Sequence, residues 1–294
     1  MAEAKKYALN ATKMKLPISV ADLPLWIGLG VLAVPTLASL GAQVWSTESG
    51  AHGPIVLAVG LWLLARAYTI CKQSAVSGST ALTWLGLVAA LAIYVFGRAF
   101  DFISLEVAGL YGAGVSMLHS RVGMKAMLLM WFPVLYLTFL IPPPGWLIDE
   151  LTAPLKQFVS LASTSTLAAA GIPLTREGVT IFVGSYQLLV EDACSGMNSM
   201  VGLIAVSLLY IYLLRGSHLR YAGALLVGVI PLAVLGNIIR VMTLILLTYF
   251  FGDEVAQGFL HVTAGLFLFV ITLILVFALD LLLWKVLPAS WKVT

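Results

Sequence analysis

Residues 260–284 read LHVTAGLFLFVITLILVFALDLLLW, and Asp280 is the only formally charged side chain among them. A helix needs about 20 apolar residues to cross a bilayer, so this segment is long enough for one span. The whole chain has a similar character, because 61% of its 294 residues are apolar and only 10% are charged. A soluble domain has about 25% charged residues. The sequence therefore predicts an all-α polytopic membrane protein and excludes a large soluble catalytic domain.

Eight such segments follow one another, which predicts about eight transmembrane helices in a single membrane-embedded domain, residues 1–294. Glu106 and Asp280 are the only acidic residues in these segments, and neither has an evident partner within a span. That observation argues against a proton-relay transporter. The predicted spans are residues 23–44, 54–71, 81–97, 102–118, 124–141, 195–214, 221–251 and 260–284.

The basic residues indicate how the spans are oriented. Lys and Arg are concentrated in the cytoplasmic loops of membrane proteins. Twelve of the 16 basic residues fall on one side of the predicted spans, together with both termini. We therefore expect cytoplasmic tails at residues 1–22 and 285–294. The twelve are Lys5, Lys6, Lys13, Lys15, Arg66, Lys72, Arg121, Lys125, Arg215, Arg220, Lys285 and Lys292.

The longest connection, residues 142–194, separates spans one to five (23–141) from spans six to eight (195–284) and is expected outside the cytoplasm. Residues 146–169 have the pattern of one or two amphipathic helices lying on the membrane surface. The β-branched and aromatic runs 179–183 and 186–190 predict a small hairpin. This hairpin leads into span six.

Cys194 stands at the expected outer N-terminus of span six. Free N–H groups and the helix dipole at that position favour a thiolate. The small neighbours Ser195 and Gly196 would let a substrate backbone approach, whereas Glu191 and Asp192 would oppose a thiolate unless a cation lies nearby. The alternative is that Cys194 is a small hydrophobic residue in an apolar protein.

Arg240 is the candidate cation, in the sequence Asn237-Ile238-Ile239-Arg240 within span seven. A charge at mid-span costs about 2.5–3.5 kcal/mol on insertion scales, so Arg240 is expected to face protein or water. Pro231 and Gly236 predict a kink in this span. The side chain of Asn237 could satisfy the backbone groups that such a kink exposes. In a continuous helix, Arg240 would lie about 16 Å below the outer end, which is deep for a surface site. The alternative is an arginine that only joins two helices.

His261 opens span eight on the same outer side. Its imidazole could act as a general base toward a thiol or as an acid toward a leaving amine. The alternative is an ordinary polar residue at the membrane boundary. We assign no role to the other three histidines, which are His52 in the outer loop before span two and His119 and His218 in cytoplasmic loops.

A cysteine, an arginine and a histidine thus converge on one side of the membrane, a combination that fits thiol acyl transfer. Cys71 and Cys194 form no disulfide framework. No Cys/His cluster has the spacing of a metal site, and no nucleotide-binding motif is present, so we expect neither metal nor cofactor.

These residues resemble the three signature blocks of the exosortase/archaeosortase family. The resemblance covers about residues 133–270 and includes Ile141–Pro144, Ala153–Leu155 and Gly171–Leu174 with Arg176–Gly178. Some archaeal relatives have arginine at the third position, so His261 points to the bacterial exosortase branch. The blocks are Glu191-Asp192-Ala193-Cys194-Ser195-Gly196, Asn237-Ile238-Ile239-Arg240-Val241 and His261-Val262-Thr263-Ala264-Gly265.

The resemblance implies a cysteine protease or transpeptidase of the cytoplasmic (inner) membrane with its site facing the periplasm. Cys194 would be the nucleophile, Arg240 the positive partner and His261 the proton-transfer residue, with Glu191, Ser195, Gly196 and Asn237 supporting them. The implied substrates are exported proteins with a C-terminal sorting signal, which consists of a PEP-CTERM-like motif, a hydrophobic span and a basic tail. A lipid or polysaccharide could be the acceptor.

Two other functions remain open from the residues alone. A non-enzymatic factor for assembly or transport of envelope polymers would use Arg240 and the acidic outer loops to bind a ligand, and would tolerate loss of Cys194. A membrane acyltransferase would use the same thiol on a lipid.

Overall fold

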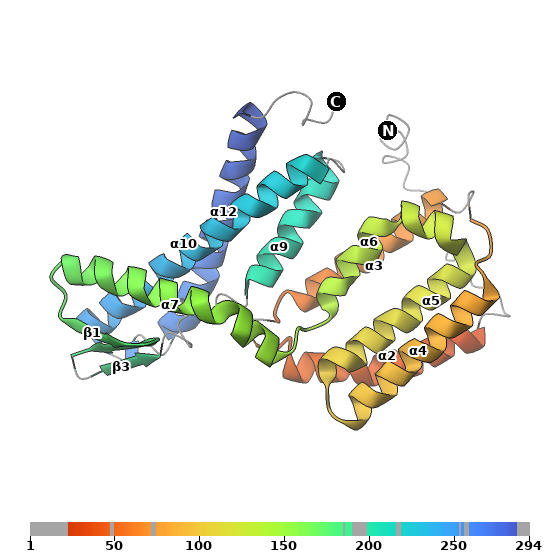
Figure 1. The fold of residues 1–294 in the computed structure, drawn as a ribbon, viewed down its shortest axis with the longest axis horizontal. Coiled ribbons are helices and arrows are strands. Elements are labelled where there is room, and N and C mark those ends of the chain that lie inside the picture. Colours follow the sequence, from red (N-terminus) through yellow and green to blue (C-terminus); the bar gives the residue numbers. More distant parts are fainter. Residues whose placement is uncertain are drawn as a thin grey trace. The chain divides into compact units, whose positions relative to one another are not determined.

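We describe a computed structural model of the chain (Figure 1). The residues that it describes are 23–47, 50–71, 75–184, 186–189, 199–215, 219–252, 254–255 and 259–286. Predictions for residues 1–22 and 287–294 of the terminal tails and for Glu191, Cys194, Ser195 and Gly196 lie outside these residues, whereas residues 285–286 end α12.

Helices account for most of the described chain, and a small antiparallel sheet lies between α7 and α9. The long apolar helices support a polytopic all-α membrane protein. The helices are α2 (Leu23–Gln43), α3 (Gly53–Cys71), α4 (Thr80–Ala99), α5 (Ile103–Leu129), α6 (Trp131–Leu137), the 3₁₀ turn η3 (Thr138–Leu140), α7 (Gly145–Ala169), α9 (Ser199–Tyr210), the π-helical turn η5 (Ile211–Arg215), α10 (Leu219–Phe251) and α12 (Phe259–Val286), and the strands are β1 (Leu174–Glu177), β2 (Thr180–Val183) and β3 (Tyr186–Leu189).

Four of the described helices are long and apolar enough to span a membrane, or five if the bent pair α5–α6 counts as one span. The four are α2, α3, α4 and the part of α10 from Gly223 to Phe251. The total of eight spans and their orientation remain predictions.

The predicted boundary between spans four (102–118) and five (124–141) falls at a break inside α5. The residues on either side of Gly123 are helical, and α5 as a whole meets the segment Trp131–Leu140 at 106°. The chain turns inside α5 at Gly123, where φ is 69°. A Cβ at this position would collide with the carbonyl oxygen of Val76. Glycine is therefore required twice, because it adopts a positive φ without strain and because there is no space for a side chain.

The predicted hairpin is part of a three-stranded sheet in the order β1-β2-β3. β1 pairs with β2 in the register Glu177↔Thr180, and β2 pairs with β3 in the register Val183↔Tyr186. β1 was not predicted from the sequence, because this exposed edge strand, Leu-Thr-Arg-Glu, lacks the apolar alternation of a half-buried strand.

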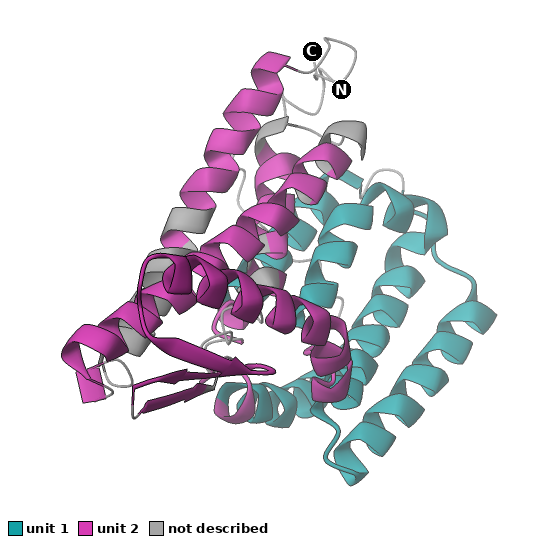
Figure 2. Cartoon of the chain, turned by 60° about the vertical axis from the view of Figure 1, so that its left-hand side comes forward, with its two compact units in different colours: residues 1–41, 55–141 teal, residues 42–54, 142–294 magenta. Residues whose placement is uncertain are grey.

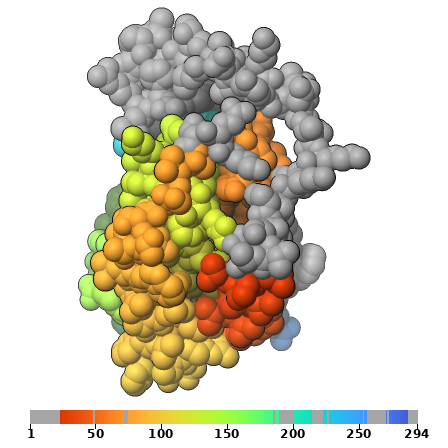
Figure 3. All heavy atoms as spheres, turned by 90° about the vertical axis from the view of Figure 1, so that its right-hand side faces the viewer, coloured from red at the N-terminus to blue at the C-terminus, as the bar shows by residue number. Residues whose placement is uncertain are grey.

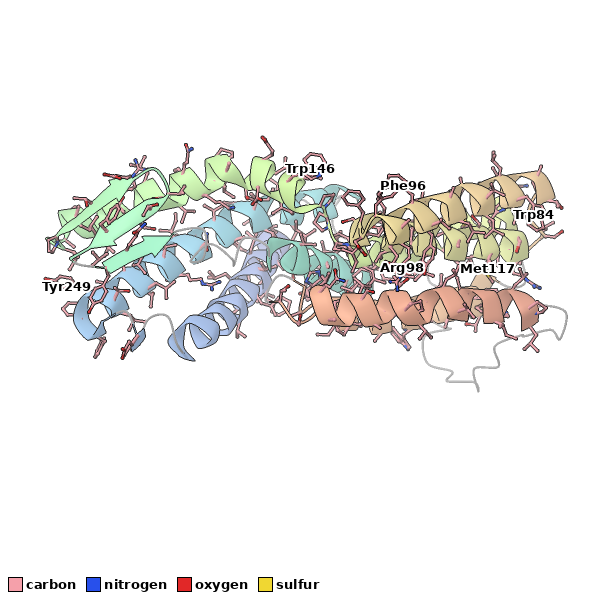
Figure 4. All side chains as sticks on the ribbon, turned by 90° about the horizontal axis from the view of Figure 1, so that it is seen from below. Trp84, Phe96, Arg98, Met117, Trp146 and Tyr249 are labelled. Atoms are coloured by element: carbon pink, nitrogen blue, oxygen red, sulfur yellow. The ribbon has the colours of Figure 1, made fainter. Side chains whose placement is uncertain are left out.

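The contacts divide the chain into unit 1, residues 1–41 and 55–141, and unit 2, residues 42–54 and 142–294 (Figure 2). In unit 1, α4 and α5 pack closely because Gly97 and Gly109 admit the opposite backbone. α4 carries exposed apolar side chains such as Trp84 and Val88, as expected of a lipid-facing surface. Trp84 is labelled in Figure 4, and the α4 segment is visible on the face drawn in Figure 3.

Both acidic residues of the predicted spans have partners that were not predicted from the sequence. In unit 1, Oε1 of Glu106 accepts hydrogen bonds from Thr36 at 2.7 Å and from Arg98 at 3.2 Å. Arg98 lies in the last turn of α4 (Figure 4), and Glu106 lies in the first turn of α5. The two predicted spans, taken separately, gave no sign that these side chains meet. In unit 2, the hydroxyl of Tyr210 donates to Asp280 at 2.8 Å.

In unit 2, α7 and the sheet pack against the C-terminal part of α10. Their common apolar core contains Val159 and Leu167 of α7, Ile181, Val183 and Leu188 of the sheet, and Val241, Leu244 and Ile245 of α10. α12 packs on another side of α10, where Ala233 and Val229 meet Val276. α10 is one helix of 33 residues, and it continues past Pro231 and Gly236.

Candidate active site

The segment that carries Cys194 joins two elements of unit 2. Cys194 lies five residues after Leu189, the last residue of β3, and five residues before Ser199, the first residue of α9. A fully extended chain covers at most about 3.6 Å per residue, so Cys194 lies within about 18 Å of both ends. The positions of β3 and α9 therefore limit where the thiol can be.

β3 is fixed against the helix that carries Arg240. Leu188 of β3 is buried in one core with Ile181 of β2 and with Val241 and Ile245 of α10. Val241 directly follows Arg240. The sheet therefore holds the chain that leads into the Cys194 segment next to the part of α10 that begins at Arg240.

Arg240 and Asn237 are both buried in unit 2, with 3% and 6% of their surfaces exposed. Residues 233, 237, 240 and 244 recur at helical spacing and share one side of α10. Ala233, on this side, packs against Val276 of α12. Arg240 is thus enclosed by protein, which avoids the cost of placing a charge in lipid.

α7 holds α10 from a different side. The hydroxyl of Ser163 donates to the carbonyl oxygen of Ile238 at 3.4 Å. The hydroxyl of Ser160 donates to the carbonyl oxygen of Gly178, in the β1–β2 turn, at 3.4 Å. Ser160, Ser163, Thr164 and Leu167 form one buried stripe on α7. The i, i+3, i+4, i+7 spacing of this stripe is a sequence signal for a protein-facing side, and the prediction of a surface helix made no use of it.

The other side of α7 is apolar and exposed, and it includes Leu151, Phe158 and Leu161. α7 is a single helix in spite of Pro154. Its predicted location on the membrane surface is compatible with this exposed side and remains a prediction.

His261 is the third residue of α12, and only the backbone of this part of α12 is described. Ala233 and Val276 give a common reference point for the two helices. Arg240 lies about 10 Å along α10 from Ala233, and His261 lies about 22 Å along α12 from Val276, in the same direction, at 1.5 Å per residue. Both residues lie beyond this contact, Arg240 about two helical turns from it on α10 and His261 about four turns from it on α12.

One histidine that received no role from the sequence lies near the start of α9. The loop between α2 and α3 belongs to unit 2 and brings the imidazole of His52 against Gly202. The sequence placed His52 on the predicted outer side but carried no signal for this contact.

Among the described residues, no group of three or more His, Cys, Asp and Glu side chains could hold a metal ion. The chain matches a known protein family. Residues 44–278 match the family model described as transmembrane exosortase, Exosortase_EpsH. No curated protein and no solved structure matches the chain significantly.

Proposed function

Because the chain belongs to the transmembrane exosortase family, we propose that it is a membrane-embedded cysteine endopeptidase and transpeptidase. Its substrates are exported proteins with a C-terminal sorting signal of the PEP-CTERM type. Cleavage takes place on the extracytoplasmic side of the cytoplasmic membrane, and the new C-terminus passes to a lipid or polysaccharide acceptor.

The observation that carries this proposal is the burial of Arg240 on the part of α10 against which the sheet packs. This arrangement brings the chain that leads to Cys194 and the candidate cation into one unit. If Arg240 only joined two helices, the sheet would have no reason to hold the segment that leads to Cys194 beside it.

The length of α10 supports a site near the membrane surface. α10 has 33 residues, and at 1.5 Å per residue it is about 50 Å long. A hydrocarbon core of about 30 Å takes about 20 residues, which from Leu219 end close to Arg240. The residues that follow Arg240 pack against α7 and the sheet, so the end of α10 need not mark the membrane surface. We therefore propose that Arg240 lies closer to the membrane surface than the depth of about 16 Å expected if the end of α10 marked that surface.

The proposed chemistry is acyl transfer through a thioester. The thiolate of Cys194 attacks the scissile carbonyl, Arg240 stabilises negative charge, and His261 transfers protons. Asn237 lies one helical turn before Arg240 and supports its position, while Glu191, Ser195 and Gly196 shape the surroundings of the thiol. A substrate with one hydrophobic span can approach from the membrane and present its motif at the surface.

The first experiment compares wild type with Cys194→Ala and Cys194→Ser. Each is co-expressed with a tagged membrane protein that carries a Pro-Glu-Pro-type C-terminal signal from the same genome. We expect wild type to shorten the substrate near the motif and both variants to leave it intact, as shown by mass spectrometry of the substrate's C-terminus. Cys71→Ala is the matched control, since it removes the other cysteine, and it should process normally.

Other results would decide between the functions. Processing by Cys194→Ala would exclude a thiol nucleophile, and dependence on Arg240 alone would favour the assembly factor. A fatty acyl group rather than a peptide on Cys194 would identify the acyltransferase.

A further inference from the structure

The two edge strands of the sheet differ in how they are protected. Edge strands expose unpaired N–H and C=O groups, and proteins discourage unwanted pairing there with charged side chains. β1 carries the charged and exposed Arg176 and Glu177, and α7 contacts this strand. β3 reads Tyr-Gln-Leu-Leu and has no charged residue, although Tyr186 and Gln187 are exposed. The edge of β3 thus lacks the charges that would discourage pairing with another chain.

The register of the sheet defines which backbone groups this edge offers. Two residues separate β2 from β3, so the pair Val183↔Tyr186 closes a tight turn and exchanges both of its backbone hydrogen bonds. Hydrogen-bonded and non-hydrogen-bonded pairs alternate along an antiparallel ladder. The next pair, Phe182↔Gln187, is therefore of the second kind, and the N–H and C=O of Gln187 point away from β2. Among the described residues, no strand pairs with this side of β3.

A peptide with prolines at alternate positions is suited to such an edge. Proline has no N–H, so within a strand its nitrogen must face away from the neighbouring strand. The two prolines of a Pro-Glu-Pro motif face the same way, because their spacing equals the two-residue period of a strand. The glutamate between them then presents its N–H and C=O to the neighbouring strand. The motif therefore loses no hydrogen bond to its prolines in this register.

We propose that the glutamate of the substrate's motif pairs antiparallel with Gln187, so that the motif adds a strand to the sheet. This inference rests on the proposed function. The glutamate N–H donates to the carbonyl oxygen of Gln187, and the N–H of Gln187 donates to the glutamate carbonyl oxygen. Directly opposite side chains share one face of a sheet, with Cβ atoms about 4.5–5.5 Å apart. The exposed side-chain amide of Gln187 therefore donates to the glutamate carboxylate, which gives the edge its specificity.

The first test detects the pairing by disulfide crosslinking in membranes. The full-length protein carries Cys71→Ala, Cys194→Ala and Gln187→Cys, and the substrate has a single cysteine in place of the motif's glutamate. Copper phenanthroline oxidises thiols that lie close together. We expect a crosslinked product on a non-reducing gel, and loss of this product when Thr175→Cys replaces Gln187→Cys. Thr175 is the matched control, since the pairs Thr175↔Phe182 and Phe182↔Gln187 place it on the same face at the other edge.

The second test removes the outward N–H of β3. Gln187→Pro keeps the hydrogen bonds to β2, because proline is tolerated in an edge strand when its nitrogen faces outward. We expect substrate processing to fall about tenfold, since the glutamate carbonyl of the substrate loses its donor. Arg176→Pro is the control and should process normally. It changes the corresponding outward position of β1, because Glu177↔Thr180 closes the other turn.

The third test changes the side-chain contact alone. Like charges directly opposite each other destabilise a strand pair. Gln187→Glu should therefore lose processing of a Pro-Glu-Pro substrate and recover it with a Pro-Lys-Pro substrate. Thr175→Glu adds the same charge at the other edge and should keep the preference of wild type. Thermal unfolding of each variant checks that it is folded.

Absence of the Gln187→Cys crosslink in a folded protein would overturn the inference, and so would normal processing by Gln187→Pro. A crosslink between two copies of the protein would make the edge a contact between copies and would overturn it too. The crosslinking assay needs no catalysis. A crosslink to the substrate without any processing by wild type would therefore contradict the proposed function alone.

Discussion

Glu106 is a buried carboxylate whose charged partner is exposed. Its side chain is 5% exposed, whereas that of Arg98 is 48% exposed. Thr36 adds a hydroxyl at 2.7 Å from Oε1. The two members of the ion pair are therefore unequal, because water can replace the carboxylate for Arg98 but cannot replace the guanidinium for Glu106.

We predict that Arg98→Ala destabilises the protein more than Glu106→Gln does. Leaving a buried group without its partner costs about 1–3 kcal/mol, and the exposure of Arg98 places the loss toward the lower end of this range. Glutamine keeps the shape and an acceptor for Thr36. Thermal unfolding in detergent measures both variants, and an Arg98→Ala protein as stable as wild type would show that the pair contributes nothing.

Single residues were predictable where one sequence position implied a strong physical constraint. A charge in an apolar run had to be enclosed, which pointed to Arg240. The partners of Glu106 and Asp280 were not predictable, because they depend on how separate helices turn toward one another. Cys194 lies outside the described residues, so its role rests on the sequence blocks and on the proposed chemistry.

At the scale of elements, the contact between α7 and α10 has a direct test. Ser163 is fully buried where α7 meets the backbone of Ile238, two residues before Arg240. Two residues turn a helix by about 200°, so the side chains of Ile238 and Arg240 leave α10 on nearly opposite sides. α7 can therefore fix the backbone without blocking the guanidinium.

We predict that Ser163→Leu lowers substrate processing strongly, because the larger side chain pushes α10 away at the level of Arg240. Extra bulk in a packed site costs about 1–3 kcal/mol. Thr166→Leu is the matched control on an exposed position of the same helix, and it should process normally. Normal processing by a folded Ser163→Leu protein would mean that this contact does not position Arg240.

The limits of helices were predicted well where apolar composition was uniform. Span 23–44 corresponds to α2 and span 221–251 to α10, each within two residues at either end. The kink expected at Pro231 did not break α10, since proline can be accommodated in a membrane helix when neighbours satisfy the backbone. β1 forms only because it pairs with β2, and composition gives no signal for that pairing. Composition likewise gives no signal for the close approach of Val76 to Gly123.

At the scale of the whole molecule, the central prediction is topology. In a background without Cys71 and Cys194, we expect Glu177→Cys to react with a membrane-impermeant maleimide in intact spheroplasts. Lys292→Cys should react only after lysis, because the positive-inside pattern places the C-terminal tail in the cytoplasm. Glu177 is exposed in β1, so access to the reagent is not limited by burial. The reverse labelling pattern would invert the proposed orientation.

The position in unit 2 of the loop of residues 42–54, which carries His52, has a consequence for the synthesis of the protein. Gly202, against which His52 packs, is made 150 residues after it. At a synthesis rate of about 5–20 residues per second, the loop waits about 8–30 s for α9. A loop that is made early thus completes its packing only when a helix made much later has been added, so a chain truncated before α9 cannot form this part of unit 2.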